Sequence, residues 1–163
     1  MKSILFIAAS AATLVAAAPL AAAVQVGPVA EVRVSFGGEV EDKPRIFGQR
    51  EKDRLTRELT KEVEKAVGGF KAGGGVLEVT IEEVKANRPT WTQMTYEPSI
   101  SYAYSFGTGG ATLDGVYIAP NGERTPIHYS WYETDIRNAQ FVSDWHDAER
   151  TFERFAKRVA KGG

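Results

Sequence analysis

The chain has 163 residues, no cysteine and nearly balanced charge, with 20 Lys and Arg residues against 21 Asp and Glu residues. This balance argues against nucleic acid as a partner, because phosphate binding needs a strong positive excess on one face. Without cysteine there is no disulfide and no lipid-bearing cysteine, so packing alone must hold the fold, which a chain of this length allows.

The first 23 residues predict export. Lys2 gives a positive start, residues 4–18 are almost wholly apolar, and Ala21-Ala22-Ala23 supplies the A-x-A pattern that signal peptidase needs. The apolar run is short for a membrane span, which takes about 20 residues. We therefore predict a signal peptide over 1–23, cleaved after Ala23 or within one or two residues of it. The mature chain, 24–163, is expected to be one periplasmic or secreted domain without a transmembrane segment.

A strand, a helix and a second strand come first in the mature chain. Residues 31–36 alternate apolar and polar side chains, the period of a half-buried strand. From about Arg50 to Val67 apolar residues recur every three or four positions, which predicts an amphipathic helix ended by Gly68-Gly69. Residues 77–82 alternate again. Because a helix joins the two strands, we expect them to be parallel, with a right-handed connection.

A long loop and three further strands are predicted next. The loop covers 85–98 and is long for a simple connection. The segment after it has the cleanest alternation in the chain. Asn121-Gly122, a strong hairpin signal, joins the last two strands, so we expect an antiparallel meander. The three predicted strands cover 99–106, 112–119 and 125–134.

The C-terminal segment predicts an amphipathic helix ended by Gly162. Charged residues occupy the positions between its apolar residues, and its aromatic rings must be buried, so this helix is expected to pack on the sheet. The predicted apolar stripe consists of Phe141, Trp145, Ala148, Phe152, Phe155, Ala156 and Val159.

These elements predict an α+β fold in the order β-α-β-β-β-β-α. We expect a two-layer sandwich: a mixed, mostly antiparallel sheet of about five strands, with two helices on one face and the other face open. If Ile127, Tyr129 and Trp131 point to the core, their neighbours point to the open face, which becomes small, polar and rich in hydroxyl groups. The residues predicted there are Ser101, Ala103, Ser105, Thr112, Asp114, His128, Ser130 and Tyr132.

We assign no catalytic residue, no metal site and no cofactor. The open face holds Ser, His and Asp, but the chain has no G-x-S-x-G turn to present a nucleophile. His128 and His146, the only histidines, lack metal-ligand spacing. Glu133 and Asp135 form a possible carboxylate pair for sugar chemistry, although acidic residues are common at strand ends.

The predicted loop supplies a second candidate surface, at Trp91, Met94 and Tyr96. Aromatic rings in a polar loop can stack on a sugar or clamp a peptide. The alternative is that the loop folds back as a lid over an edge of the sheet. The predicted ligand-binding residues are therefore Trp91, Met94, Tyr96, His128, Ser130 and Tyr132.

Three short stretches of the C-terminal half carry a family resemblance. They are Gly109-Gly110-Ala111-Thr112-Leu113, Asn121-Gly122-Glu123 and Trp145-x-x-Ala148-x-x-x-Phe152-x-x-Phe155-Ala156. Together they resemble uncharacterised bacterial envelope proteins, over about the last third of the chain. The resemblance implies a signal peptide joined to one small α+β domain in a bacterial envelope. Many such proteins are lipoproteins, and the missing cysteine departs from that pattern. No catalytic residue carries over.

The sequence thus predicts a non-catalytic periplasmic accessory or binding domain of the bacterial cell envelope. Its expected partner is an envelope protein, peptide or glycan that meets the open sheet face or the loop around Trp91. One alternative is an envelope hydrolase that uses Ser, His and acidic residues on the open face. Another is a structural subunit that oligomerises through an edge of the sheet.

Overall fold

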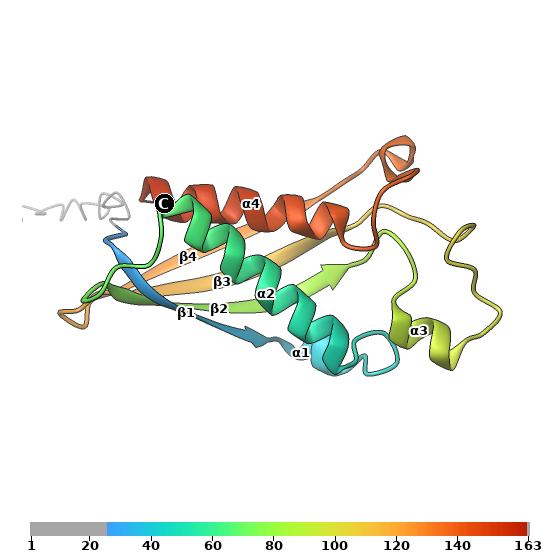
Figure 1. The fold of residues 1–163 in the computed structure, drawn as a ribbon, viewed down its shortest axis with the longest axis horizontal. Helices are drawn as coiled ribbons and strands as arrows, with labels where there is room; N and C mark the ends of the chain where they lie inside the picture. The colour runs from blue at the N-terminus through green and yellow to red at the C-terminus, as the bar shows by residue number, and fades with distance from the viewer. Residues whose placement is uncertain (1–25, 163) are drawn as a thin grey trace, which may run out of the picture.

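The described residues form one open, mixed sheet of four strands, and two long helices cover one of its faces (Figure 1). The structure is a computed structural model that describes residues 26–162. The predicted signal peptide and its cleavage site lie outside these residues. The α+β class, the mixed sheet and the two covering helices agree with the prediction from the sequence.

The strands lie side by side in chain order, with β1 and β2 parallel and the remaining neighbours antiparallel. This arrangement confirms the predicted strand–helix–strand unit and the hairpin at Asn121-Gly122. The elements are β1 (Val29–Phe36), α1 (Gly38–Glu41), α2 (Gln49–Ala66), β2 (Gly75–Lys85), α3 (Trp91–Tyr96), β3 (Gly110–Ile118), β4 (Arg124–Tyr132), the short 3-10 helix η1 (Ile136–Ala139) and α4 (His146–Lys161).

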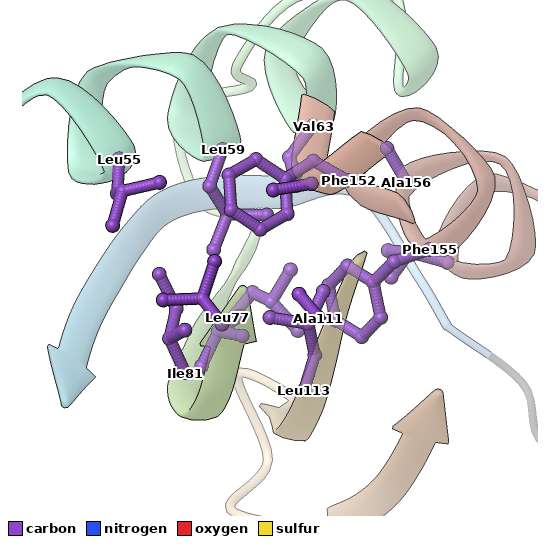
Figure 2. Close-up of a cluster of buried hydrophobic side chains, with 14 of the residues drawn as sticks. Leu55, Leu59, Val63, Leu77, Ile81, Ala111, Leu113, Phe152, Phe155 and Ala156 are labelled. Carbon is purple, nitrogen blue, oxygen red and sulfur yellow. The ribbon is translucent and has the colours of Figure 1, made fainter. Parts of the chain in front are cut away.

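The core lies between the sheet and the two long helices. Figure 2 shows Leu59 and Val63 of α2 and Phe152 of α4 above Leu77 and other apolar residues of β2 and β3. All of these side chains are excluded from solvent because both helices turn one apolar stripe toward the sheet. Gly162 ends α4 in the left-handed conformation, with φ of 85°, as predicted.

The strand predicted over 99–106 does not form, which is why the sheet has four strands and not about five. Residues 97–109, all described, form turns instead, for example through the bond from Ser105 N to Ser101 O at 2.9 Å. Backbone groups of this segment bond locally or to the residues after β2, as in the bonds from Ile100 N to Glu97 O and from Gly107 N to Asn87 O, and no strand of the sheet pairs with it. Ser101, Ala103 and Ser105 are therefore not on the open sheet face.

The predicted apolar stripe of the last helix was wrong at its first position. Phe141 lies before α4, in the left-handed conformation with φ of 63°, and its side chain is 95% exposed. The buried stripe begins instead at Trp145, whose ring stacks on Phe47 at a centroid distance of 6.1 Å. Residues 142–145 are not helical, so α4 begins only at His146 and the helical period does not extend back to Phe141.

Candidate functional site

The large exposed apolar side chains of the described residues gather in two segments, one between β2 and β3 and the other between β4 and α4. Figure 1 shows both segments at the same end of the molecule, opposite the C-terminus. We call this the aromatic end. Exposed apolar groups concentrated in one place mark interaction sites more often than scattered ones do. The aromatic end consists of Trp91, Tyr96, Tyr102, Tyr104, Phe106, Ile136 and Phe141.

Arginine side chains lie against four of these rings. The guanidinium carbon of Arg45 is 5.8 Å from the ring centroid of Tyr96, and that of Arg50 is 5.2 Å from the ring centroid of Trp91. Arg88 lies 5.4 Å and 5.9 Å from the rings of Tyr102 and Phe106. Cation–π contacts of this kind orient the rings without burying them. Trp, Tyr and Arg are also the residue types that dominate binding hot spots.

Helix α3 is anchored to the start of α2 by the carboxylate of Glu51. This side chain is only 4% exposed, and it accepts hydrogen bonds from Gly48 N at 3.1 Å, Thr92 N at 3.0 Å and Thr92 Oγ1 at 2.6 Å. Thr90 caps α3 by accepting from Gln93 N and donates to the carbonyl of Ile46. Thr90-x-x-Gln93 is a capping box, the signal in the sequence that would have identified α3.

Acid is expected to weaken this anchor. Burial raises the pKa of Glu51, but hydrogen bonds from the Thr92 hydroxyl and from nearby backbone N–H groups outweigh it, so the pKa lies below its usual 4.5. The carboxylate therefore stabilises the fold above about pH 4.5, and this contribution is lost as the pH falls through the lowered pKa. We expect Glu51→Gln to cost about 1–2 kcal/mol at pH 7 and clearly less at pH 3, measured by urea unfolding. An equal loss of stability at pH 7 and pH 3 would show that the ionised form of Glu51 does not stabilise the fold.

A buried amide–carboxylate pair fixes the base of the aromatic end. Asn87 donates through Nδ2 to Asp147 Oδ2 at 2.5 Å and accepts at Oδ1 from Asp147 N at 2.9 Å. Gly109 N donates to the same carboxylate oxygen at 2.9 Å. The backbone of Asn87 bonds to Asp144 O and Gly107 N. One side chain pair thus ties the end of β2, the start of β3 and the start of α4 together.

Arg88 joins the two segments of the aromatic end. Its Nε donates to the carbonyl of Val142 at 2.8 Å, and its Nη1 donates to the carbonyl of Tyr102 at 2.8 Å. Because one guanidinium group satisfies carbonyls from both loops, the loops are held in position before any partner arrives. Binding to such a surface loses less conformational entropy than binding to loose loops.

A groove of about 500 Å³ lies beside these loops, at the end of β2. Its apolar lining includes Phe47, Val84 and Ile100, and Lys85 and Arg88 add positive charge. Volumes of this size are typical of small-molecule pockets, but this groove is open to solvent and continuous with the exposed Phe106. We treat it as part of the aromatic end.

The structure separates the predicted site residues into two groups. Trp91, Met94 and Tyr96 lie on α3 at the aromatic end, where Trp91 and Tyr96 are exposed and Met94 is half-buried. The predictions missed Tyr102, Tyr104 and Phe106 as site residues because the pattern had placed them in a strand. They also missed Phe141, which the pattern had placed in a helix. His128, Ser130 and Tyr132 lie on the open face of β4 and do not contribute to the aromatic end.

Hydrogen bonds across the open face pair its polar side chains with one another. His128 Nδ1 is 2.5 Å from Asp114 Oδ1, and the Thr112 hydroxyl is 2.9 Å from that of Ser130. Tyr132 bonds to the same Thr112 hydroxyl, and burial raises the pKa of Tyr132 to about 12. Among the described hydrogen bonds none joins Ser130 to His128, so the Ser-His-Asp arrangement of the hydrolase alternative is not assembled here.

The carboxylate pair after β4 has structural partners. Glu133 accepts from the backbone of Asp135 and of Thr134, and these bonds lower its pKa. The side-chain bond from Arg137 lowers the pKa of Asp135 in the same way. Glycoside hydrolysis needs one acid with a raised pKa, and neither of these groups has one.

No group of three or more His, Cys, Asp or Glu side chains among residues 26–162 is placed to hold a metal ion. No helix in the same range is both long and apolar enough to cross a membrane.

Comparison with known proteins gives a weak structural similarity. No family model matches the chain, and no curated protein matches it. Among solved structures, it is similar to the rare lipoprotein B from Shewanella oneidensis, with 10% identity, a TM-score of 0.35, and coverage of 80% of this chain and 91% of that one. It is also similar to a minor lipoprotein from Acinetobacter baumannii, with 8% identity, a TM-score of 0.29, and coverage of 81% and 90%. At TM-scores this low the similarity supports no functional argument.

Proposed function

We propose that the protein is a non-catalytic binding domain of the bacterial cell envelope, working in the periplasm or outside the cell, and that it engages its partner through the aromatic end. The observation that carries the proposal is the gathering of the large exposed apolar side chains at one end of the fold. The envelope setting is supported by the predicted signal peptide and by the family resemblance of the sequence.

The aromatic end supports binding better than the open sheet face does. The hydrogen bonds from Arg88 to the carbonyls of Val142 and Tyr102, its two cation–π contacts and the Asn87–Asp147 pair hold these loops in place. On the open face the polar groups satisfy one another, and the large exposed apolar residues lie elsewhere among the described residues. An interface that forms at the aromatic end therefore buries apolar area, which is the main favourable term in association.

Helix α3 holds the residues for which the sequence left two roles open, a cover over an edge of the sheet or a binding surface. Thr92 ties α3 to Glu51 of α2, and Thr90 ties it to the carbonyl of Ile46, which favours a role for this segment in holding the fold together. Its ring at Trp91 is 61% exposed and fills no core position. We expect Trp91→Ala to change the free energy of unfolding by less than about 1 kcal/mol, measured by urea unfolding. A large loss of stability would assign Trp91 to the cover and remove it from the binding surface.

Retention of envelope material tests the proposed function. The purified mature protein, immobilised, is expected to retain a component of a detergent-solubilised envelope extract of the source organism. The double variant Tyr104→Ser/Phe141→Asn should lose that component, and asparagine suits the left-handed backbone at position 141. The matched open-face variant His128→Ser/Ser130→Ala should keep it. Equal retention by both double variants, or loss only in the open-face variant, would contradict the proposal.

A further inference from the structure

We propose that the groove at the end of β2 binds an extended peptide segment of an envelope protein, and that this segment adds to the free edge of β2 as a further strand. This inference rests on the proposed function and names the partner of the aromatic end. Two features carry it: a stretch of β2 that has a neighbouring strand on one side only, and an apolar groove that lies along the other side.

Strand β2 continues beyond the end of β1. The last residue pair between the two strands joins Phe36 to Ile81, and Gly37 N donates to Ile81 O at 2.9 Å. The chain then turns into α1, whereas β2 runs on to Lys85 and pairs with β3 as far as Gly110. Figure 1 shows β2 extending past the end of β1 toward α3. The last part of β2 is therefore a free strand edge on the side of β1.

This free edge presents the backbone groups of Val84 and Ala86. In an antiparallel pair, successive residues alternate between bonding to the neighbouring strand and pointing away from it. Glu133 N donates to Gly109 O, so the odd-numbered residues of β3 bond to β4 and the even-numbered ones bond to β2. Residues 83 and 85 of β2 lie opposite 112 and 110 and bond to them. The N–H and C=O groups of Val84 and Ala86 consequently point to the other side, where no strand of the described sheet pairs with them.

The groove of about 500 Å³ lies along this free edge, because Val84 and Ala86 both line it. Its other walls include the apolar side chains of Phe47, Ile100 and Phe106. Unpaired backbone donors and acceptors at a strand edge are complementary to a second extended backbone, whose main-chain hydrogen bonds supply the affinity. Every second side chain of such a segment would meet the apolar walls. Since the groove has walls on its far side as well, it fits a single chain segment better than the sheet edge of a second copy.

Amide hydrogen exchange of the protein alone tests whether the edge is free. The N–H groups of Val84 and Ala86 are expected to exchange at least about tenfold faster than those of Glu83 and Lys85, which bond to β3. Equal protection of all four amides would overturn the proposal, because the edge would then already be paired.

A phage-displayed library of random heptapeptides, selected on the immobilised mature protein, tests peptide binding. A selected peptide should protect the amides of Val84 and Ala86 from exchange. N-methylation at every second position of the peptide should weaken its binding about tenfold, because each change removes a main-chain hydrogen bond, and N-methylation at the positions between should have a much smaller effect. Failure to select a peptide, or binding without this alternation, would overturn the proposal.

Two substitutions in one loop compare the groove with the surface beside it. Phe106→Ser should weaken peptide binding about fivefold or more, because this ring lines the groove. Tyr104→Ser should leave it nearly unchanged, since Tyr104 is exposed outside the groove lining, where it would contact the partner beyond the bound segment. Urea unfolding of both variants controls for loss of folding. Equal weakening of peptide binding by both variants would contradict binding in the groove.

Retention of the envelope component separates this inference from the proposed function. If the component is lost with Tyr104→Ser/Phe141→Asn but kept with Phe106→Ser, and it leaves the amides of Val84 and Ala86 unprotected, the proposed function stands and strand addition in the groove fails. If retention depends on neither the two rings nor Phe106, both proposals fail. Loss of retention with Phe106→Ser, together with protection of the two amides by the component, would support both.

Discussion

Replacing Phe152 with alanine is expected to lower the free energy of unfolding by about 3–5 kcal/mol, because the ring is fully buried between α2, α4 and the sheet. Phe141→Ala, the same substitution 11 positions earlier, should cost almost nothing, since that ring is 95% exposed. The periodicity of the sequence assigned both residues to one stripe. Urea unfolding of the two variants measures both losses in the free energy of unfolding and tests whether only Phe152 belongs to the buried stripe.

A glycine at position 141 is expected to stabilise the fold, whereas a glycine inside a helix would destabilise it. Phe141→Gly is expected to raise the free energy of unfolding by about 1 kcal/mol, because glycine adopts the left-handed conformation without a steric penalty. A glycine inside a regular helix would instead lower it by about 1 kcal/mol. Destabilisation by Phe141→Gly, or a loss with Phe141→Ala close to that of Phe152→Ala, would contradict the position of this residue outside α4.

Replacing Asp147 with alanine is expected to cost about 2–4 kcal/mol. The substitution leaves Gly109 N without its acceptor in a buried place and removes one of the two acceptors of Asn87 Nδ2. Asp147→Asn should cost less than about 1.5 kcal/mol, because its amide oxygen can accept both hydrogen bonds and its amide nitrogen can occupy the position of Oδ1, which has no described partner. Thermal and urea unfolding measure both losses.

The Asn87–Asp147 pair should also behave as a unit. Because each residue donates to the other, the losses of Asn87→Ala and Asp147→Ala are expected to be non-additive by at least about 1 kcal/mol in a double-mutant cycle. Asp53→Ala, which removes an exposed carboxylate from α2, serves as the control. Its effect on the free energy of unfolding should add to that of either Asn87→Ala or Asp147→Ala. Additive losses for Asn87 and Asp147 would show that the pair does not fix the base of the aromatic end.

The sheet and the helices that cover it could be predicted from the sequence, because in these elements the spacing of the apolar residues matches the side that is buried. The helical period in α2 continues through Leu55, Leu59 and Val63, and all three side chains are buried. The alternation around Leu77 and Ile81 gave β2, and a strand–helix–strand unit leaves little choice but a parallel pair. The side of β4 that carries His128 was also predicted correctly, since strand side chains alternate between faces.

The aromatic end could not be predicted in the same way. Tyr102, Tyr104 and Phe106 alternate as in a strand, but whether a strand forms depends on tertiary pairing, which local sequence does not report. Phe141 falls on the helical period by coincidence, ahead of a helix that starts at His146. Trp91 and Tyr96 were predicted as ligand-binding residues because their segment showed no period and was expected to be a loop, whereas the structure places both on α3.

Photo-crosslinking in living cells tests most directly whether the aromatic end is the binding surface. A benzophenone amino acid replaces Tyr104 or Phe141 in one set of strains and His128 or Glu123 in another, all at exposed positions. After irradiation, adducts with an envelope component are expected at positions 104 and 141 and not at 128 or 123. Adducts at His128 on the open sheet face, with none at 104 and 141, would contradict the account.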